Sequence, residues 1–355
     1  MFRPRIALTM GDVAGIGPEV IARAWGDVRL HDWCRPVVVG HPRVMERAVR
    51  LVGGGVGVVE VARIDAAAPG TLAIPCWNPS PVAADQVPPG ADDARAGRAA
   101  YDYLVAAAQA TLAGQVDAIT TAPLSKAALH RAGLAYPGHT EILAEQCGVA
   151  EFAMMLYLPP GAAVRSEHGL GVVHVTLHTS IRSIPALLTT AGIAGKIRLI
   201  DQFMRRIAGR PPRIGVCALN PHAGEQGLFG DEELRVIAPA VREAQTLGLD
   251  AAGPFPADTL LKRACGGEFD AVVAMYHDQG HIALKLIGFD RAVNITLGLP
   301  IVRTSPSHGT AFDIAWRGAA DSTGLLEAVR VASLLAGGSC DRRPAAQSSS
   351  KAPLP

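Results

Sequence analysis

The sequence predicts an α/β protein built around a largely parallel β-sheet, and three observations support that prediction. Short apolar segments rich in β-branched residues alternate along the chain with longer segments of helical periodicity. Alternating strands and helices are typical of parallel sheets that are covered by helices on both faces. The chain has 355 residues, of which 49% are hydrophobic and 18% charged, which is enough for one large core or for two lobes that share a cleft.

The predicted strands are short apolar segments, and helices follow most of them. Strands are expected near residues 5–10, 36–40, 116–121, 153–158, 171–177, 213–219 and 269–276. Helices are expected over residues 17–25, 93–113, 185–208, 231–246 and 322–335. The helix over residues 93–113 has the strongest pattern, because it is rich in alanine and is followed by Gly114. Residues 337–355 are rich in Ser, Pro and Gly without a hydrophobic period, which predicts a disordered tail.

Charge and composition exclude several classes of protein. The 33 Lys and Arg residues nearly balance the 32 Asp and Glu residues, so the chain lacks the overall charge of a protein that binds nucleic acid or anionic membranes. The N-terminus enters a strand pattern without a cleavable signal, and no apolar stretch has the length of a membrane helix, so a cytoplasmic protein is expected. The six cysteines never form a C-x-x-C pair, which argues against a zinc ribbon.

A glycine-rich turn follows the first predicted strand. Gly11, Gly15 and Gly17 do not have the spacing of the G-x-G-x-x-G dinucleotide fingerprint, and the chain has no P-loop. These glycines either belong to a ligand site or permit a tight turn before the helix that begins at Pro18. Asp12 is the better site candidate, since ligand sites in α/β proteins lie at the carboxyl ends of strands.

Three of the eleven histidines lie just beyond predicted strands: His178, His222 and His277. Strand ends that open into one cleft could bring three imidazoles to one divalent metal ion and leave coordination positions open for a substrate. The alternative is that each is an ordinary hydrogen-bonded loop histidine. His281 lies one helical turn after His277 and either joins the metal or has an ordinary place on the helix face. His174 shares a strand face with His178 and either supports the site or belongs to the core.

Two further groups of residues could bind an anionic substrate. His139 precedes a predicted helix with Thr140 as its N-cap, and a substrate group could bind to the amides of its first turn. Lys285, Asn294 and Arg303 follow one another at intervals of nine residues. An ammonium, an amide and a guanidinium together suit a phosphate or carboxylate, whereas the alternative is that both charges are solvated at the surface.

Taken together, these segments resemble the 4-hydroxythreonine-4-phosphate dehydrogenase family of vitamin B6 biosynthesis. The similar segments are GDVAGIGPEV, TAPLSKAALHRAG, YPGHTEIL, LNPHAGEQGLFGDEE, GPFPADT, YHDQGHIALK and VNITLGLPIVRTSPSHGTAFDIAWRG, and the resemblance covers residues 5–336. It implies two α/β/α lobes with an interlobe cleft, as in isocitrate and isopropylmalate dehydrogenases. Residues 1–140 and 305–336 would form the first lobe and residues 141–304 the second. It also implies a homodimer whose active sites lie at the subunit interface.

The resemblance also assigns roles to individual residues. It places the metal ligands on His178, His222 and His277, and the substrate contacts on His139, Thr140, Lys285, Asn294 and Arg303. The segment SPSHGTAFDIAWRG is similar to the HGSAPDIAGKG adenosine-binding loop of the isocitrate and isopropylmalate group, which binds NAD without a Rossmann fingerprint. His308, Gly309, Thr310 and Asp313 are therefore the candidates for binding NAD or NADP, and Trp316 replaces a glycine of that motif. Zinc is the expected metal, with manganese, magnesium or cobalt as alternatives.

The reaction implied by the resemblance is oxidation of a hydroxyl group in a 4-phosphorylated hydroxy acid, followed by loss of CO2. The expected conversion is 4-hydroxy-L-threonine 4-phosphate to 3-amino-2-oxopropyl phosphate, and 4-phospho-D-threonate or 4-phospho-D-erythronate is the alternative substrate. A diol dicarboxylate dehydrogenase, a metal-dependent phosphohydrolase and a non-enzymatic binding protein are less favoured. Asp258, Lys126 and Asp278 are the candidate proton acceptors.

Overall fold

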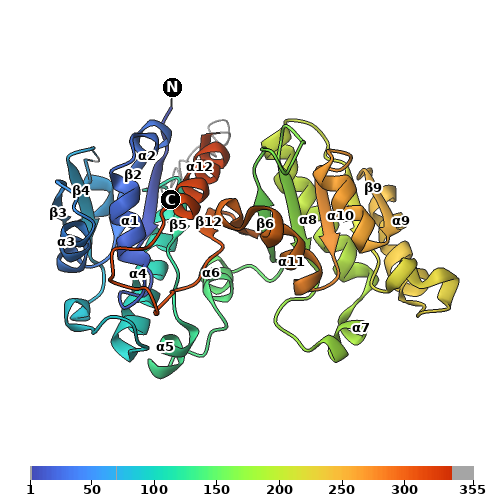
Figure 1. The fold of residues 1–355 in the computed structure, drawn as a ribbon, viewed down its shortest axis with the longest axis horizontal. Coiled ribbons are helices and arrows are strands. Elements are labelled where there is room, and N and C mark those ends of the chain that lie inside the picture. The colour runs from blue at the N-terminus through green and yellow to red at the C-terminus, as the bar shows by residue number, and fades with distance from the viewer. Residues whose placement is uncertain (1, 69, 338–355) are drawn as a thin grey trace, which may run out of the picture.

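The computed structural model describes residues 2–68 and 70–337, and one twelve-stranded β-sheet runs through them (Figure 1). Its strand order is β3-β4-β2-β1-β5-β12-β11-β6-β7-β10-β8-β9. The strands are β1 (Arg5–Thr9), β2 (Arg35–Val39), β3 (Gly57–Val61), β4 (Ala73–Trp77), β5 (Ala118–Thr121), β6 (Ala153–Leu158), β7 (Leu170–His174), β8 (Ile214–Cys217), β9 (Ala251–Phe255), β10 (Ala271–Ala274), β11 (Val293–Leu297) and β12 (Val302–Pro306).

The sheet is mainly parallel, as predicted, and its antiparallel pairs lie in the middle. There β6 pairs with β7 and with β11, and β11 pairs with β12. Every predicted strand is present, whereas β11 and β12 were not among the predicted strands. The strands β3, β4 and β9 were not predicted either. Their sequences explain this, because β4 and β9 contain proline and β3 is partly exposed after a glycine run.

The main helices are α1 (Gly17–Trp25), α2 (Val28–Trp33), α3 (Pro42–Leu51), α4 (Ala94–Leu112), α5 (Lys126–Arg131), α6 (His139–Cys147), α7 (Ile184–Leu187), α8 (Thr190–Ala208), α9 (Ala238–Thr246), α10 (Ala257–Cys265), α11 (His277–Gly288) and α12 (Thr323–Gly337). Short helical turns are η1 (Ile64–Ala66), η2 (Ala84–Gln86), η3 (Ile181–Ser183), η4 (Pro221–Gly227), η5 (Glu233–Ile237) and η6 (Phe289–Arg291). The predicted tail lies outside the described residues except for Gly337, which ends α12.

Two predicted helices are interrupted in the structure. The helix expected over residues 185–208 is divided into α7 and α8, because Thr189 caps the start of α8 by accepting a hydrogen bond from the amide of Gly192. Within the described residues, no single helix meets the length and hydropathy expected of a membrane span, and the pair Ile181–Leu187 and Thr190–Ala208 meets them only jointly, with a bend of 93°. The helix expected over residues 231–246 begins with the π-helical turn η5 before α9.

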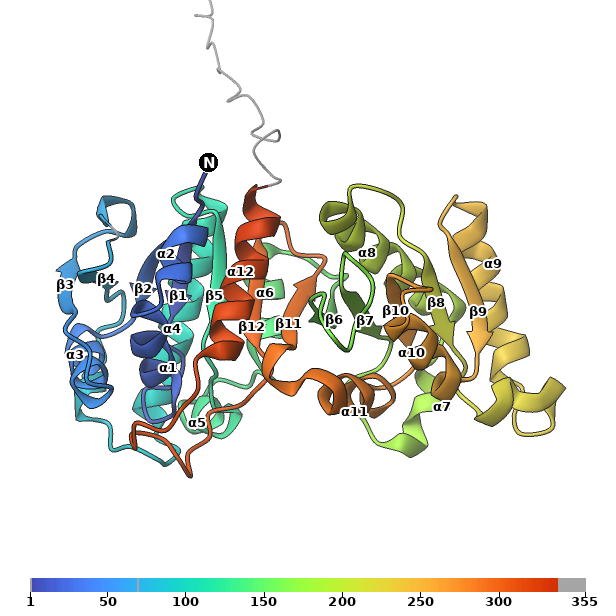
Figure 2. The ribbon, with the colours of Figure 1, turned by 45° about the horizontal axis from the view of Figure 1, so that its top comes forward.

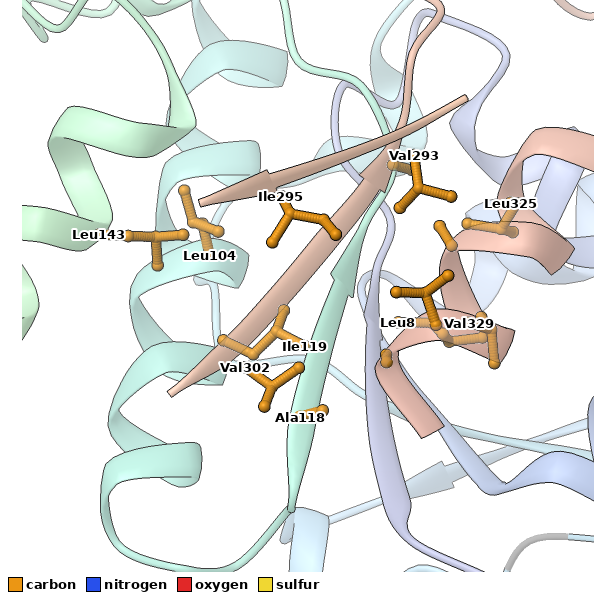
Figure 3. Packing of buried hydrophobic residues seen from close by; sticks show 14 of the residues in the cluster. Leu8, Leu104, Ala118, Ile119, Leu143, Val293, Ile295, Val302, Leu325 and Val329 are labelled. Carbon is orange, nitrogen blue, oxygen red and sulfur yellow. The ribbon is translucent and has the colours of Figure 1, made fainter. Parts of the chain in front are cut away.

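Apolar side chains pack on both faces of the central strands. Figure 3 shows Leu104 of α4 and Leu143 of α6 on one side, with Leu325 and Val329 of α12 on the other. Ile119 of β5 lies between them and is fully buried. Because α6 packs on α4 and the sheet continues across the middle of the molecule, the lobe boundary expected at residue 140 stays a prediction.

The loops that follow strands of both halves lie on the same side of the molecule. Figure 2 shows α5, α7, α11 and the segment between β12 and α12 along this side. Neighbouring strands in a sheet twist by about 20–25°, so a long sheet can turn the carboxyl ends of distant strands toward one region. The candidate site residues are found at these ends.

Candidate active site

A cavity of about 140 Å³ lies beside the carboxyl ends of β5 and β12. Three of the predicted substrate residues line it, namely His139, Asn294 and Arg303, together with His308 and Gly309 of the predicted cofactor loop. These residues are separated by up to 170 positions in the sequence. The structure therefore brings residues of the predicted substrate-binding set and of the predicted cofactor-binding set to one cavity.

Arg303 is the dominant charge of this cavity. Its side chain is 2% exposed, and its guanidinium donates hydrogen bonds to the hydroxyls of Thr296 (3.1 Å) and Thr121 (2.8 Å). Its Nε atom has no partner, and no carboxylate of the described residues lies within ion-pair distance. Burial lowers the pKa of Arg303 to about 10, with the charge of Glu141 opposing the shift. A buried guanidinium without a counter-charge favours binding of an anion.

The cavity offers further unsatisfied polar atoms. The Asn294 side-chain oxygen and the Nε2 atom of His308 are buried without a hydrogen-bond partner. Burial lowers the pKa of His139, and the positive charges of Arg303 and Lys126 lower it further, so its imidazole is neutral at neutral pH. Buried polar groups usually have partners, so these atoms indicate a place for a polar ligand.

The three predicted metal ligands follow three neighbouring strands, since β10 lies between β7 and β8. His178 comes after β7, His277 begins α11 after β10, and His222 lies in η4 after β8. The rings of His178 and His277 are 5.9 Å apart and line a common cavity of about 190 Å³. The Nδ1 of His277 donates to the Asp278 carboxylate at 2.7 Å, which leaves its Nε2 free to bind a metal ion.

His222 does not join the other two imidazoles in this arrangement. Its side chain is 73% exposed, lies 3.5 Å from the carboxylate of Glu225 and contacts the ring of Phe229. Residues 222–226 all have positive φ angles, between 43° and 76°. Left-handed backbone costs L-residues about 1–2 kcal/mol each, and such turns concentrate at functional sites. In the part of the chain that the structure describes, no three His, Cys, Asp or Glu residues are gathered so as to hold a metal ion.

The donor set fits a divalent ion in its chemistry, whereas its placement leaves His222 apart from His178 and His277. All three donors are imidazoles, which suit zinc. Two of them are adjacent, and the third follows the next strand of the same sheet edge. Gln279 links these strand ends, because its side chain accepts from the Met275 amide (2.7 Å) and donates to the Ala218 carbonyl (2.8 Å).

His281 has a larger role than an ordinary helix-face position. It is 6% exposed, and its ring stacks on that of His277 with centroids 3.7 Å apart. A hydrogen bond of 3.1 Å joins its Nδ1 to Nε2 of His174, whose Nδ1 donates to the Met154 carbonyl at 3.4 Å. Burial lowers the pKa of His174 to about 4, so the pair is neutral. Two buried imidazoles thus support the ring of His277 from behind.

Thr140 and Lys285 occupy different positions from those expected. The N-cap of α6 is Gly138 and not Thr140, because the helix begins one residue before the threonine. Thr140 instead lies inside the first turn, with its hydroxyl 3.5 Å from that of Thr296, which also holds the guanidinium in the cavity. Lys285 places its ammonium 5.5 Å from the centre of the Phe289 ring. In the described residues Lys285 forms no hydrogen bond to Asn294 or Arg303, with which it was grouped from the sequence.

The predicted cofactor loop packs against the glycine-rich turn after β1. The amide of Ile16 donates to the Thr310 carbonyl at 3.0 Å. A β-carbon on Gly15 would lie 2.9 Å from that same carbonyl oxygen, so only glycine permits this approach. Gly15 therefore serves close packing with this loop, whereas Gly11 packs against the Pro123 carbonyl and Gly17 against the Met10 carbonyl.

Trp316 adopts a positive φ of 60°, which explains why the related motif has glycine at this position. Its indole nitrogen donates to the Val13 carbonyl at 2.9 Å, and the guanidinium of Arg47 lies 3.8 Å from its ring centre. These contacts hold the tryptophan in a left-handed conformation. Asp313 is exposed on the same loop.

The three candidate proton acceptors have different surroundings. The positive charge of Lys126 lowers the pKa of both His139 and His178, so this lysine lies near both imidazoles. Asp278 is bound to the imidazole of its neighbour, and Asp258 is exposed in the first turn of α10. Its nearness to His139 and His178 distinguishes Lys126 from Asp258 and Asp278.

Several residues of the site were not predicted. Thr121 and Thr296 orient the guanidinium, and each lies in a strand whose apolar pattern gave no sign of a polar contact. Gln279 was also missed, although its place two residues after His277 offered a signal. Asp12, the candidate after β1, is fully buried with one oxygen atom unpaired and accepts from the Ala14 amide at 2.8 Å.

Comparison with known proteins shows which family the chain resembles. The family model for the pyridoxal phosphate biosynthetic protein PdxA matches residues 32–332. The chain is 44% identical to a 4-hydroxythreonine-4-phosphate dehydrogenase of Trichlorobacter lovleyi, over 94% of this chain and 98% of that protein. It is 43% identical to a D-threonate 4-phosphate dehydrogenase of Salmonella typhimurium, over 93% and 98% of the two chains. The crystal structure of 4-hydroxythreonine-4-phosphate dehydrogenase from Klebsiella pneumoniae superposes with a TM-score of 0.83 at 42% identity, covering 94% of this chain and 99% of that one. The chain therefore belongs to the PdxA family.

Proposed function

We propose that the protein is a dehydrogenase that uses NAD or NADP and a divalent metal ion to oxidise and decarboxylate a 4-phosphorylated hydroxy acid. The observation that supports this most directly is the buried guanidinium of Arg303, which has no carboxylate partner among the described residues and faces the cavity shared with His308 and Gly309. A substrate phosphate there would neutralise the buried charge beside the cofactor loop. Both relatives compared above carry the name of a phosphorylated substrate.

The residues of the cavity bind and orient the substrate. The Arg303 guanidinium, held by Thr121 and Thr296, donates hydrogen bonds to the phosphate, and the unpaired oxygen of Asn294 accepts one from a substrate hydroxyl. Neutral His139 can donate or accept a hydrogen bond without adding charge. These contacts fix the reacting carbon relative to the nicotinamide, and fixed orientation contributes strongly to rate.

His178, His222 and His277 would hold the metal ion, which when bound would polarise the hydroxyl being oxidised and the oxygen that receives electrons as CO2 leaves. The Asp278 carboxylate keeps the free nitrogen of His277 on Nε2, and His281 stacks behind that ring. NAD or NADP, when bound, would accept the hydride removed from the substrate carbon, and Lys126 is the proposed acceptor of the hydroxyl proton once its amine is unprotonated. Thr310 and Asp313 complete the proposed cofactor-binding set.

The substrate is proposed to be 4-hydroxy-L-threonine 4-phosphate, with 4-phospho-D-threonate or 4-phospho-D-erythronate as the second candidate, because relatives with both kinds of name share similar identity with this chain. The test is an assay of each compound, and of a diol dicarboxylate, with NAD or NADP and Mn2+ or Zn2+, followed by NADH or NADPH absorbance. The compound with the highest kcat/KM identifies the substrate. Turnover of the dicarboxylate alone would contradict the proposed phosphate site.

We also propose a homodimer with shared active sites. The α11 helix carries the exposed apolar side chains Ile282, Leu286 and Ile287 next to the site, and an exposed apolar patch of this kind is typical of a protein interface. Sedimentation should give a dimer. If the partner completes each site, mixing inactive His178→Ala and Arg303→Ala chains should restore part of the activity, whereas a fully active monomer would contradict the proposal.

A further inference from the structure

The predicted cofactor loop, residues 308–318, is held at its far end by α1. At its near end, His308 and Gly309 line the cavity that also contains Arg303. At its far end, Trp316 contacts the side chain of Glu19 in the first turn of α1. Figure 2 shows this segment, between β12 and α12, running from the site toward α1. The path of the loop beside the cavity therefore depends on how α1 holds it.

Glu19 forms the main polar contact between α1 and the loop. Its side chain is fully buried, and one carboxylate oxygen accepts a hydrogen bond from the backbone amide of Trp316. In the part of the chain that the structure describes, the other oxygen is buried without a hydrogen-bond partner. Burial of a carboxylate is unfavourable unless it is well bonded, so packing alone does not account for a glutamate at this place. Its charge strengthens the one hydrogen bond that it forms with the loop.

Trp316 needs this support, because its backbone has a left-handed conformation with a φ of 60°. Such a conformation persists in a residue other than glycine only where the surroundings fix it. The indole nitrogen donates to the Val13 carbonyl at 2.9 Å, and the Arg47 guanidinium lies 3.8 Å from the ring centre. Nε and Nη2 of Arg47 are buried without hydrogen-bond partners among the described residues. Glu19 fixes the backbone of Trp316, whereas these two contacts fix its ring.

Two more contacts hold the loop on either side of its exposed middle. The Ile16 amide, just before α1, donates to the Thr310 carbonyl at 3.0 Å. Arg23 of α1 donates to the Gly318 carbonyl. Asp313, the exposed candidate for cofactor binding, lies between these two points. The first helix and the turn before it thus set the conformation of the segment that presents Asp313.

We propose that Glu19 is a positioning residue that holds the cofactor loop in the conformation that binds NAD or NADP. This inference rests on the proposed cofactor-binding role of the loop. Because Glu19 is buried beneath Trp316, it acts through the backbone of that residue. When only a fraction of the molecules keeps the binding conformation, the apparent affinity falls in proportion to that fraction.

The test measures NADH binding to the full-length protein by NADH fluorescence. Glu19→Ala should weaken binding by about 10-fold, since a charge-assisted hydrogen bond to the loop is lost. Glu19→Gln keeps an oxygen acceptor for the Trp316 amide and should restore most of the affinity. The matched control is Asp27→Ala, because Asp27 also accepts a hydrogen bond from a backbone amide, but from Arg29 within α2. It should lose stability and bind NADH as the wild type does.

Two readouts distinguish a displaced loop from a generally damaged protein. In Glu19→Ala the KM for NAD should rise while kcat changes little. Stabilisation by inorganic phosphate should stay at the wild-type value, because Thr121 and Thr296 hold Arg303 without contacting Glu19. Loss of the phosphate effect together with NADH binding would show a general structural role and contradict the proposal.

Further variants separate this inference from the proposed function. Glu19→Asp withdraws the carboxylate by one methylene and should also weaken NADH binding, which keeps the test decisive should Glu19→Ala fail to fold. Trp316→Gly permits the positive φ without strain, so Glu19→Ala should have a smaller effect in that background. Wild-type binding by Glu19→Ala or Glu19→Asp, with weak binding by Asp313→Ala, would overturn the positioning role alone. Wild-type binding by both Asp313→Ala and His308→Ala would overturn the proposed cofactor loop and this inference with it.

Discussion

Replacing Arg303 by methionine should make the unliganded protein more stable and abolish its affinity for phosphate. Burial lowers the pKa of Arg303 from 12.5 to about 10, which corresponds to about 3 kcal/mol of unfavourable free energy at neutral pH. The penalty is fully present below the folded pKa and disappears as the pH rises above the unfolded value. Loss of the two hydrogen bonds to Thr121 and Thr296 offsets about 1 kcal/mol each, so the net stabilisation is about 1 kcal/mol.

Urea unfolding with and without inorganic phosphate measures both effects. Phosphate at about one hundred times its dissociation constant should stabilise the wild type by about 2.7 kcal/mol and Arg303→Met by nothing measurable. The matched control is Arg210→Met, whose guanidinium is paired with the buried Asp270 at 2.9 Å and whose loss should destabilise the protein. If Arg303→Met is less stable than the wild type and still responds to phosphate, the anion-binding role of this residue is wrong.

Three further predictions concern other parts of the site. Burial raises the pKa of Asp12 to about 6, so ionisation of this carboxyl lowers the free energy of unfolding as the pH rises through roughly 4 to 6. Asp12→Asn should therefore raise the free energy of unfolding by about 3 kcal/mol at neutral pH and change it little near pH 4, as measured by urea titration. Gly15→Ala should push the Thr310 carbonyl away, which would raise KM for NAD while Mn2+ affinity stays at the wild-type value. Lys126→Met should lower kcat by about 10²- to 10⁴-fold and leave phosphate binding intact. Asp258→Asn should have nearly wild-type kcat. Equal kcat in both variants would contradict the role of Lys126 as the proton acceptor.

The fold could be predicted from the sequence wherever the signal was local. Apolar runs gave the buried parallel strands, and the alanine-rich segment before Gly114 gave α4. The breaks at Thr189 and at η5 could not be predicted from periodicity, because a capping hydrogen bond and a π-helical turn interrupt patterns that remain apolar on both sides. Strands that contain proline, such as β4, gave too weak a signal.

The sequence indicated which residues lie at the strand ends of the candidate site, but not how their side chains are oriented there. Strand ends placed His178 and His277 together, because both follow neighbouring parallel strands. The orientation of His222 depends on a left-handed turn, which has no periodic signature. The burial of Arg303 depends on Thr121, which is 182 residues earlier in the sequence. Contacts of that kind arise from strand pairing and cannot be derived from spacing along the chain.

Oxidative decarboxylation is tested most directly by measuring NADH, CO2 and inorganic phosphate in the same reaction. The protein would be incubated with 4-hydroxy-L-threonine 4-phosphate or 4-phospho-D-threonate, NAD and Mn2+, with Arg303→Met as the control. We expect equal amounts of NADH and CO2 from the preferred substrate, no release of phosphate, and no turnover by the variant. Release of inorganic phosphate without NADH would instead identify a metal-dependent phosphohydrolase and contradict the proposed chemistry.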